Sequence, residues 1–435
     1  MQDTIFALAT GSQACAVAII RISGPRATEI GTAFCKRDLR AREASYARII
    51  DPKTGELIDT GLVLFFVGPA SFTGEDCVEF QVHGSRAVVL RLLDALGREP
   101  GARIAQPGEF IRRAFDNGKL ALTSVEGVAD LIAAKTDLQR RQALAQAGGA
   151  LALRGGIWRD MLLDALALIT AEIDFADEGE APAEVLGVVR KIVENLSSEF
   201  SLALADAERG ELIRNGFRVV LCGPPNAGKS TLMNTIARRD VAIVTEHAGT
   251  TRDVIEVELD LGGLPVIICD TAGIREAVDP VEAVGVQRSI DAIGSADLSI
   301  WVSAAVDGVG RPELGSGRSI LVASKMDQVQ DVPAWADLGI SARSGDGIDE
   351  LIRRISAFGS EFLAGEPPIV TNARQRACVE AAARQVARLM ADDFSALELV
   401  ADDLLRCADI LQELLGRIGA EDILGAVFSR FCMGK

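Results

Sequence analysis

One stretch of the sequence has the residue types and spacing needed to hold the phosphates of a nucleotide. Residues 223–230 read GPPNAGKS, which fits the phosphate-binding loop pattern G-x-x-x-x-G-K-S/T between the apolar FRVVLC and the helix-like STLMNTIA. Glycines let backbone N–H groups turn toward phosphate oxygens, and the following helix N-terminus adds partial positive charge. We predict that Lys229 reaches the β- and γ-phosphates and that the Ser230 hydroxyl binds Mg²⁺. Taken alone, the motif could also be a strand–helix turn without a ligand.

Two further motifs follow in the order that such a site requires. Gly-Thr-Thr-Arg at 249–252 lies in a polar stretch before a strand-like one. We predict that Thr251 completes the Mg²⁺ shell and that its backbone senses the γ-phosphate, which would couple nucleotide state to loop order. Asp-Thr-Ala-Gly at 270–273 ends the strand-like LPVIIC. We expect Asp270 to hold Mg²⁺ through water and the Gly273 N–H to meet the γ-phosphate.

A third motif predicts which base is bound. Ser-Lys-Met-Asp at 324–327 ends the strand-like SILVA, and the Asp327 carboxylate can accept both N–H donors of guanine's N1–N2 edge. Adenine lacks that pair, so the motif favours GTP over ATP. Lys325 can lay its methylenes across the base. GTPases usually have asparagine at the position of Ser324. We expect the absence of the asparagine amide to loosen the loop or the base contact. Residues 341–343, Ser-Ala-Arg, fit the loop that caps the guanine oxygen.

The residue that orients the attacking water is not obvious from these motifs. Many small GTPases place a glutamine directly after D-x-x-G, where this chain has Ile274. An isoleucine cannot orient water. Hydrolysis is therefore expected either to be slow or to use another residue together with a cation.

The surrounding sequence indicates how these motifs are positioned. Residues 1–118 mix β-like runs such as VAIIRIS and DCVEFQVHG with the helical AVVLRLLDALG, which predicts an α+β domain. Residues 119–212 and 366–435 have apolar repeats at helical spacing and predict the two parts of one helical domain. Residues 213–365 alternate strand and helix, which predicts an inserted doubly wound α/β domain. The expected fold class is multidomain, α+β and α/β.

Composition narrows the class of protein. The net charge of −17 argues against binding nucleic acid by bulk attraction, although it does not exclude a local basic surface. Eight scattered cysteines without a C-x-x-C pair predict neither a zinc site nor a disulfide framework. The acidic start of the chain is unlike a signal peptide, and no apolar run approaches the ~20 residues of a membrane helix. We expect a cytoplasmic protein.

Several stretches of the chain resemble the MnmE (TrmE) family of tRNA-modification GTPases. GPPNAGKST, EHAGTTRD and DTAGIRE are similar to the family's nucleotide motifs. SFTGEDCVEFQVHG, QPGEFIRRAFDNGKLAL and the terminal FCMGK are similar to its N-terminal and C-terminal signatures. The resemblance covers nearly the whole chain. It implies an N-terminal α+β folate-binding-like domain, a helical domain and an inserted Ras-like P-loop GTPase domain.

The resemblance also implies roles at the nucleotide site. A potassium ion would replace an arginine finger, held by Asn226 and by a loop at Thr245, His247 and Thr250 that acts mainly through backbone oxygens. The water-orienting glutamate would be Glu282, which by itself reads as an exposed carboxylate at a helix start. Glu282, Lys229 and Thr251 are thus the expected catalytic residues. The residues expected to contact GTP are Asn226, Ala227, Gly228, Lys229, Ser230, Thr231, Thr245, Glu246, His247, Ala248, Gly249, Thr250, Thr251, Asp270, Thr271, Ala272, Gly273, Ser324, Lys325, Asp327, Ser341, Ala342 and Arg343.

In the N-terminal domain the resemblance implies a homodimer and a site for 5,10-methylenetetrahydrofolate, with 5-formyltetrahydrofolate as a bound analogue. The folate contacts map onto Arg21, Glu79, Lys119 and Lys435. A carboxylate suits the donor–acceptor edge of a pterin ring, and Arg21 and Lys119 suit the glutamate tail. Cys432 lies in the C-terminal motif, where a nucleophile is one interpretation. Because the sequence shows no base beside it, a packed or pocket-lining cysteine is favoured.

The family's partner is MnmG, a flavoprotein that uses FAD and NADH. The resemblance implies that the two proteins together build an aminomethyl or carboxymethylaminomethyl group on C5 of the wobble uridine of certain tRNAs. The FAD is expected on the partner, because this chain has no G-x-G-x-x-G after a strand. Two other interpretations stay open: a GTP-switched binding protein for ribosome assembly, and an N-terminal domain that only dimerises. Ribosome-assembly GTPases usually carry a basic RNA-binding module, whereas this chain is acidic.

Overall fold

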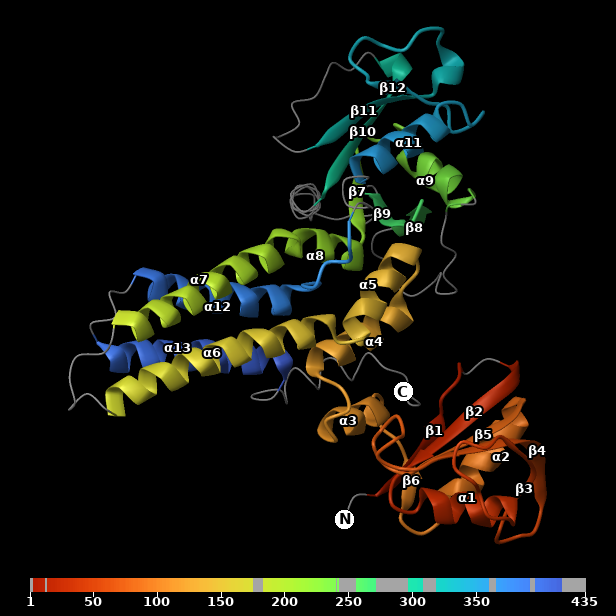
Figure 1. The fold of residues 1–435 in the computed structure, drawn as a ribbon. Coiled ribbons are helices and arrows are strands. Elements are labelled where there is room, and N and C mark those ends of the chain that lie inside the picture. Colours follow the sequence, from red (N-terminus) through yellow and green to blue (C-terminus); the bar gives the residue numbers. More distant parts are fainter. Residues whose placement is uncertain are drawn as a thin grey trace, which may run out of the picture. The chain divides into compact units, whose positions relative to one another are not determined.

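The fold is known from a computed structural model. It describes residues 3–11, 14–174, 183–239, 241, 256–270, 296–307, 318–359, 365–391 and 396–416. The chain divides into two compact units, each of which is considered by itself below. The first comprises Met1–Ala129, Gln146–Ser197 and Ala381–Lys435, and the second comprises Asp130–Ala145 and Ser198–Glu380. The elements of both can be followed along the chain in Figure 1.

A six-stranded sheet organises the N-terminal part of the first unit. Its order is β3-β4-β5-β2-β1-β6, and all neighbours are antiparallel except β1 and β6. The strands are β1 (Thr4–Leu8), β2 (Cys15–Ser23), β3 (Ser45–Ile50), β4 (Leu57–Phe66), β5 (Cys77–Gly84) and β6 (Ala102–Ile104). Side chains alternate between faces, so β3 buries Ala47 and Ile49 but exposes Tyr46 and Arg48. At the β3 edge, one face of the sheet therefore belongs to the core and the other is exposed, whereas β1 buries residues on both faces.

Two helices complete the core on the buried face of this sheet. They are α1 (Ala27–Cys35) and α2 (Arg86–Gly97). Phe34 of α1 and Leu92 of α2 are fully buried together with Phe80 of β5. Ser85 begins α2 by accepting a hydrogen bond from the Val88 N–H at 3.2 Å, as N-cap serines do. The α+β architecture predicted for the N-terminal residues is confirmed.

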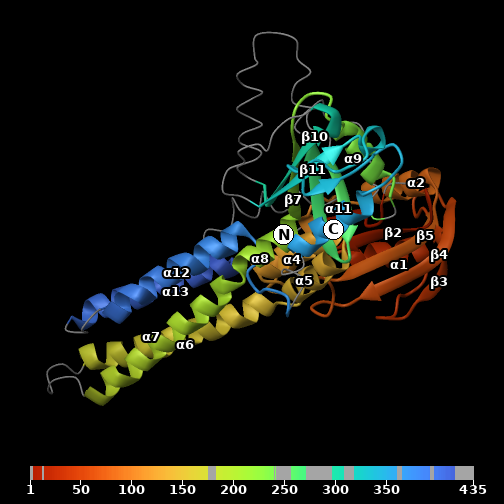
Figure 2. The ribbon, with the colours of Figure 1, turned by 90° about the horizontal axis from the view of Figure 1, so that it is seen from above.

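A further set of helices makes up the other kind of structure. They are α3 (Glu109–Asp116), α4 (Leu122–Ala133), α5 (Asp137–Ala147), α6 (Ala150–Asp174), α7 (Ala183–Ala205), α8 (Ala207–Asn215), α12 (Ala373–Ala391) and α13 (Leu397–Leu415). Although α6 and α13 are far apart in the sequence, they lie side by side, as Figures 1 and 2 show. Gly155 contributes to this close packing, because a Cβ there would make a tight contact of 3.2 Å with the Leu415 side chain. Within the described ranges, no helix has the length and apolar character needed to cross a membrane.

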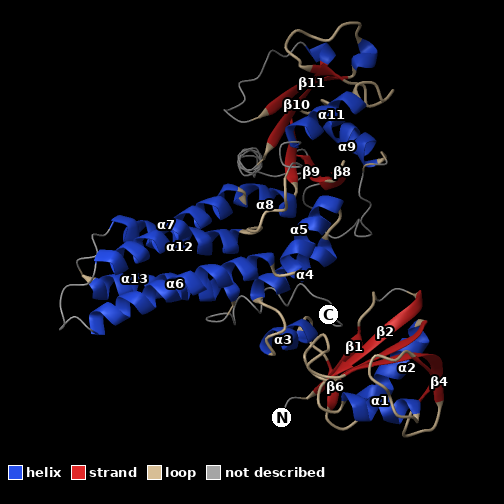
Figure 3. Cartoon of the chain, in the orientation of Figure 1, coloured by secondary structure: helices blue, strands red, loops and turns tan. Residues whose placement is uncertain are grey.

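The second unit contains another six-stranded sheet, in the order β12-β11-β10-β7-β9-β8. Its elements are β7 (Phe217–Cys222), α9 (Lys229–Ala237), β8 (Glu256–Leu261), β9 (Leu264–Asp270), β10 (Leu298–Ala304), β11 (Ser319–Ser324), β12 (Leu338–Gly339) and α11 (Ile348–Gly359). Figure 3 shows the strands of this unit together with the helices α9 and α11. Strand β8 alone is antiparallel to its neighbour. Gly262 and Gly263, both with positive φ, form the two-residue turn that reverses the chain after it.

Candidate functional site

The phosphate-binding loop has the predicted context, between strand β7 and helix α9. Gly223 has φ +137°, and a Cβ there would lie 2.0 Å from the Val302 carbonyl oxygen of β10, so a side chain does not fit. Gly228, with φ +92°, is the N-cap of α9. Asn226 also has a positive φ, +60°, which asparagine adopts more readily than most residues. The loop sequence thus meets the backbone's conformational needs.

Lys229 is held by the loop that it belongs to. Its side chain is buried, and its Nζ donates hydrogen bonds to the carbonyl oxygens of Gly223 and Pro224 at 2.9 Å each. The ammonium group therefore lies beside the first turn of α9, where the helix N-terminus adds partial positive charge. A lysine and a helix N-terminus in one place form a site suited to phosphate.

Ser230 and Asp270 meet at the carboxyl edge of the second sheet. Strands β7 and β9 are parallel neighbours in which Leu221 is paired with Asp270, so both strands end at the same edge. The Ser230 Oγ donates to Asp270 Oδ2 at 2.9 Å, and Asp270 is 1% exposed. A hydroxyl and a carboxylate are the hard oxygen donors that Mg²⁺ prefers. The pair fits the predicted metal site, with Ser230 as a direct ligand and Asp270 acting through water.

The predicted base-binding segment begins where β11 ends. The Ser324 Oγ donates to the Ala227 carbonyl oxygen of the phosphate-binding loop at 2.5 Å. The serine thus makes a direct bond to that loop, although the absence of asparagine was expected to loosen this region. Asp327 Oδ1 accepts a hydrogen bond from the Ser341 Oγ at 2.8 Å, which joins the two predicted base-side motifs.

Some of the remaining predicted nucleotide contacts lie among the described residues. Thr231 and Arg343 are exposed, while the Ala342 carbonyl accepts a hydrogen bond from Thr235 Oγ1 at 3.2 Å. Lys325 has a positive φ of 58°. The other predicted site residues lie outside the described residues: Thr245, Glu246, His247, Ala248, Gly249, Thr250, Thr251, Thr271, Ala272, Gly273, Ile274, Glu282, Cys432 and Lys435.

Two of the residues assigned to folate are neighbours in the first sheet. Arg21 of β2 and Glu79 of β5 lie opposite each other, and the Arg21 guanidinium is 2.8 Å from Glu79 Oε1. The guanidinium carbon of Arg21 also lies 5.0 Å from the Phe72 ring centroid and 5.7 Å from that of Phe110. Phe72 is 40% exposed, whereas Phe110 is buried. A charged pair and an accessible aromatic ring are therefore found together.

Lys119 joins the same region through the loop that carries Phe72. Its Nζ donates to the Pro69 carbonyl oxygen at 2.8 Å. At Gly74 of this loop, a Cβ would lie 3.3 Å from the Lys119 side chain. The loop at 69–75 thus contacts both Lys119 and Arg21, and Arg21 in turn is paired with Glu79.

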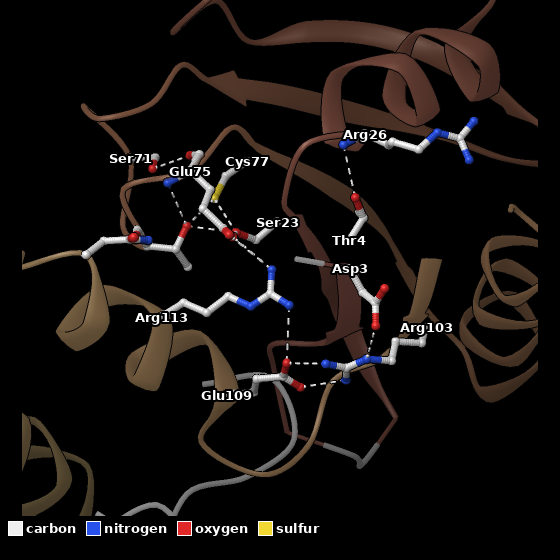
Figure 4. Close-up of polar contacts among 12 residues, drawn as sticks. Asp3, Thr4, Ser23, Arg26, Ser71, Glu75, Cys77, Arg103, Glu109 and Arg113 are labelled. Carbon is white, nitrogen blue, oxygen red and sulfur yellow. Dashed lines mark hydrogen bonds and ion pairs between the residues drawn. The ribbon is translucent and has the colours of Figure 1, made fainter. Parts of the chain in front are cut away.

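A buried ion-pair network anchors this loop (Figure 4). Arg113 of α3 donates to the two carboxylate oxygens of Glu75 at 3.2 and 3.0 Å and to Glu109 Oε1 at 3.2 Å. Glu75 also accepts a hydrogen bond from the Ser23 Oγ of β2 at 2.6 Å. Loop, strand and helix are therefore joined by one carboxylate. Glu75 and Arg113 received no role from the sequence, although both lie in stretches that carry the family resemblance.

The network continues from Glu109 toward the start of the chain. Arg103 donates to Glu109 Oε1 at 2.6 Å and to Asp3 Oδ2 at 3.2 Å. Burial acts to raise the pKa of Glu109, but hydrogen bonds from Arg103 and from the Gln106 N–H outweigh it and hold the pKa below its usual range. Glu109 is therefore an ionised structural group at neutral pH.

Comparison with known proteins identifies the family. A family model described as the MnmE helical domain matches residues 122–432, and one described as the GTP-binding protein TrmE N-terminus matches residues 4–119. The chain belongs to the MnmE (TrmE) family. The predicted fold class of α+β, helical and P-loop GTPase domains agrees with this membership.

Relatives named tRNA modification GTPase MnmE match along the whole chain. The one from Beijerinckia indica is 47% identical over 434 residues, covering 100% of this chain and 96% of its own. The one from Caulobacter vibrioides is 48% identical over 454 residues, covering 100% of both. Among solved structures, the G domain of the T. maritima FeoB iron transporter is 22% identical with a TM-score of 0.26, covering 33% of this chain and 98% of its own.

Proposed function

We propose that this chain hydrolyses GTP and acts in the modification of tRNA. The observation that carries the GTP part is the meeting of Lys229, Ser230 and Asp270 at one sheet edge, together with Asp327 after strand β11. The family's relatives named as tRNA modification GTPases support the tRNA part.

Individual residues have distinct roles in this proposal. Lys229 and the loop N–H groups bind the β- and γ-phosphates, which carry the charge that develops during hydrolysis. Ser230 and Thr251 would hold Mg²⁺, with Asp270 acting through water, and the ion would supply charge neutralisation at these phosphates. Asp327 accepts the N1–H and N2–H donors of guanine. Its acceptor capacity suffices, because a carboxylate offers about four lone-pair positions and Ser341 uses one.

For catalysis we assign the orientation of the attacking water to Glu282 and a potassium ion to Asn226, Thr245, His247 and Thr250. The exposed side chain of Asn226 and its positive φ support its availability to a ligand. GTP hydrolysis should be much faster in KCl than in NaCl of equal ionic strength, and Asn226→Ala should remove most of the difference. Equal rates of the unchanged protein in both salts would rule out the cation role.

In the N-terminal domain we propose a site for 5,10-methylenetetrahydrofolate at Arg21, Glu79, Lys119 and Lys435. The support from geometry is the cluster of Arg21, Glu79 and the accessible ring of Phe72, since a pterin needs a polar edge partner and an apolar face. The chemistry of these side chains fits such a ligand, which would supply the one-carbon unit.

Titration with 5-formyltetrahydrofolate tests the folate site. Arg21→Ala and Glu79→Gln should each weaken binding without unfolding the protein. Arg48→Ala is the matched control, because Arg48 is an exposed arginine of the same sheet, on β3. No binding by the unchanged protein would leave the N-terminal domain with a purely structural role.

We also propose that the chain forms a homodimer. The sheet face opposite α1 and α2 carries exposed apolar side chains at Val17, Tyr46 and Leu62, which are 54%, 68% and 39% exposed. Tyr46 and Leu62 are paired across strands, so they form one continuous apolar area. Leu62→Glu should shift the protein toward monomer in sedimentation. An unchanged dimer would place the interface elsewhere.

The finer proposal is that this protein is cytoplasmic and works with an FAD-dependent MnmG-type flavoprotein. Together they would use the folate carbon to build an aminomethyl or carboxymethylaminomethyl group on C5 of the wobble uridine. Nucleoside analysis of tRNA from cells that lack this protein should show loss of that modification. Unchanged wobble uridines with defective ribosome assembly would instead support the alternative of a GTP-switched assembly protein.

A further inference from the structure

Ser324 occupies a position where two functional loops of the second unit meet. It is the last residue of β11, is paired with Ala304 of β10, and is 4% exposed. Its Oγ donates to the carbonyl oxygen of Ala227, a fully buried residue of the phosphate-binding loop. The two residues are 97 positions apart, so this bond joins separate parts of the chain. Ser324 therefore ties the base-binding segment to the phosphate-binding loop.

This bond uses the whole donor capacity of the side chain. A serine hydroxyl has one proton, whereas an asparagine amide has two N–H donors. Guanine N7 and O6 are both acceptors, so a hydrogen bond from the protein to either one requires a donor group. With its proton given to Ala227 at 2.5 Å, Ser324 has none left for the base. An asparagine here could donate to the loop and to N7 at the same time.

The rest of the segment is held independently of Ser324. The Met326 N–H donates to the Ile340 carbonyl oxygen at 3.1 Å, next to the bond between Ser341 and Asp327. Asp327 thus remains positioned by contacts that do not involve Ser324. An asparagine would both bond the phosphate-binding loop and donate to guanine N7. These two functions can therefore be separated in this chain.

We propose that Ser324 is a positioning residue that tethers the guanine-binding segment to the phosphate-binding loop and leaves guanine N7 without a donor. Discrimination of the base then rests on Asp327 at the N1–N2 edge. The inference rests on the proposed GTP site and specifies how that site recognises guanine.

Competition binding with three diphosphates tests the proposal on the full chain. In 7-deaza-GDP a C–H replaces N7, and in inosine diphosphate the N2 amino group is missing. The unchanged protein should bind GDP and 7-deaza-GDP with the same affinity within about 2-fold, because no hydrogen bond to N7 is lost. It should bind inosine diphosphate more weakly, because Asp327 loses one partner.

Two variants separate the tether from base recognition. Ser324→Ala should weaken GDP binding about 2- to 12-fold, the range expected for one hydrogen bond, while the ratio between GDP and 7-deaza-GDP stays unchanged. Ser324→Asn should create a preference for GDP over 7-deaza-GDP of a similar size, which a purely structural role of this residue would not produce. Ser319→Ala, at the first residue of the same strand, is the matched control and should bind GDP normally.

The outcomes distinguish this inference from the proposed function. If the unchanged protein binds 7-deaza-GDP more than about 2-fold more weakly than GDP, N7 has a donor and the inference is overturned. If Ser324→Ala binds GDP as well as the unchanged protein does, the tether has no role in binding. If no guanine nucleotide binds at all, the proposed GTP site itself is wrong.

Discussion

Replacing Arg113 with methionine should destabilise the N-terminal domain strongly, because it leaves a buried carboxylate without its cation. The Arg113 side chain is 6% exposed, that of Glu75 is 12% exposed, and their closest atoms are 3.0 Å apart. Methionine keeps an apolar stem of similar length but has no donors. Glu75 would keep its hydrogen bond from Ser23 and lose both bonds from the guanidinium.

The expected magnitude follows from this burial. Removing one partner of a buried ion pair costs about 3–5 kcal/mol. Because every 1.4 kcal/mol is tenfold in an equilibrium, a loss of about 3 kcal/mol should speed exchange of protected amides roughly 100-fold. Hydrogen exchange of β2 and β5 peptides in the full chain measures this without assuming that all domains unfold together. Adding Glu75→Gln to Arg113→Met should restore part of the loss, because an amide is cheaper to bury than a charge.

An exposed ion pair in the same domain provides the control. Arg40 and Glu43 are 3.6 Å apart with side chains 82% and 48% exposed, so Arg40→Met should cost less than about 1 kcal/mol. If exchange in β2 and β5 is the same for Arg113→Met as for the unchanged protein, the buried network does not stabilise this domain. Weaker folate binding by Arg113→Met would further show that the network positions the loop at 69–75.

Three further predictions concern specificity, catalysis and pH. Asp327→Asn should weaken GDP binding by roughly 10- to 150-fold in competition assays, because hydrogen bonds to a charged acceptor contribute about 1.5–3 kcal/mol. Unchanged affinity would show that Asp327 does not recognise the base. Glu282→Ala should leave GTP binding near normal and cut hydrolysis in single-turnover assays; a comparable loss of affinity would make Glu282 structural. Burial acts to raise the pKa of Asp51, but hydrogen bonds from Arg91 and from the Lys53 and Thr54 N–H groups hold it below its usual range. A lowered folded-state pKa stabilises the fold above the unfolded pKa of about 4, and this stability is lost as pH falls further. Asp51→Asn should therefore flatten the acid side of the stability profile measured by hydrogen exchange, and an unchanged profile would contradict this.

Local patterns predicted the elements of the second unit well. The apolar runs FRVVLC, LPVIICD and SILVAS became β7, β9 and β11, because continuous apolar stretches of that length suit buried parallel strands. The phosphate-binding loop was also readable, since its chemistry lies in consecutive residues. The antiparallel direction of β8 was not predicted, although Gly262 and Gly263 mark the turn that causes it.

The candidate folate site of the N-terminal domain was harder to predict from the residues alone. Arg21, Glu79 and Lys119 each resemble an ordinary surface charge, and only the family resemblance singled them out. Their proximity depends on the register between β2 and β5 and on the loop at 69–75. Register is set by which side chains pack on the buried face of the whole sheet, and a single strand does not reveal its partner.

The sequence by itself determined the class of this protein, through the phosphate-binding motif and the family signatures, and it predicted a metal-side role for Asp270 and a base-side role for Asp327. These are local features, because a few consecutive residues define both the backbone shape and the chemistry. The tertiary structure alone decided which distant side chains meet. It joined Ser324 to Ala227 and Arg113 to Glu75, residues 97 and 38 positions apart. Such contacts arise from strand order and core packing, which are properties of the folded chain as a whole.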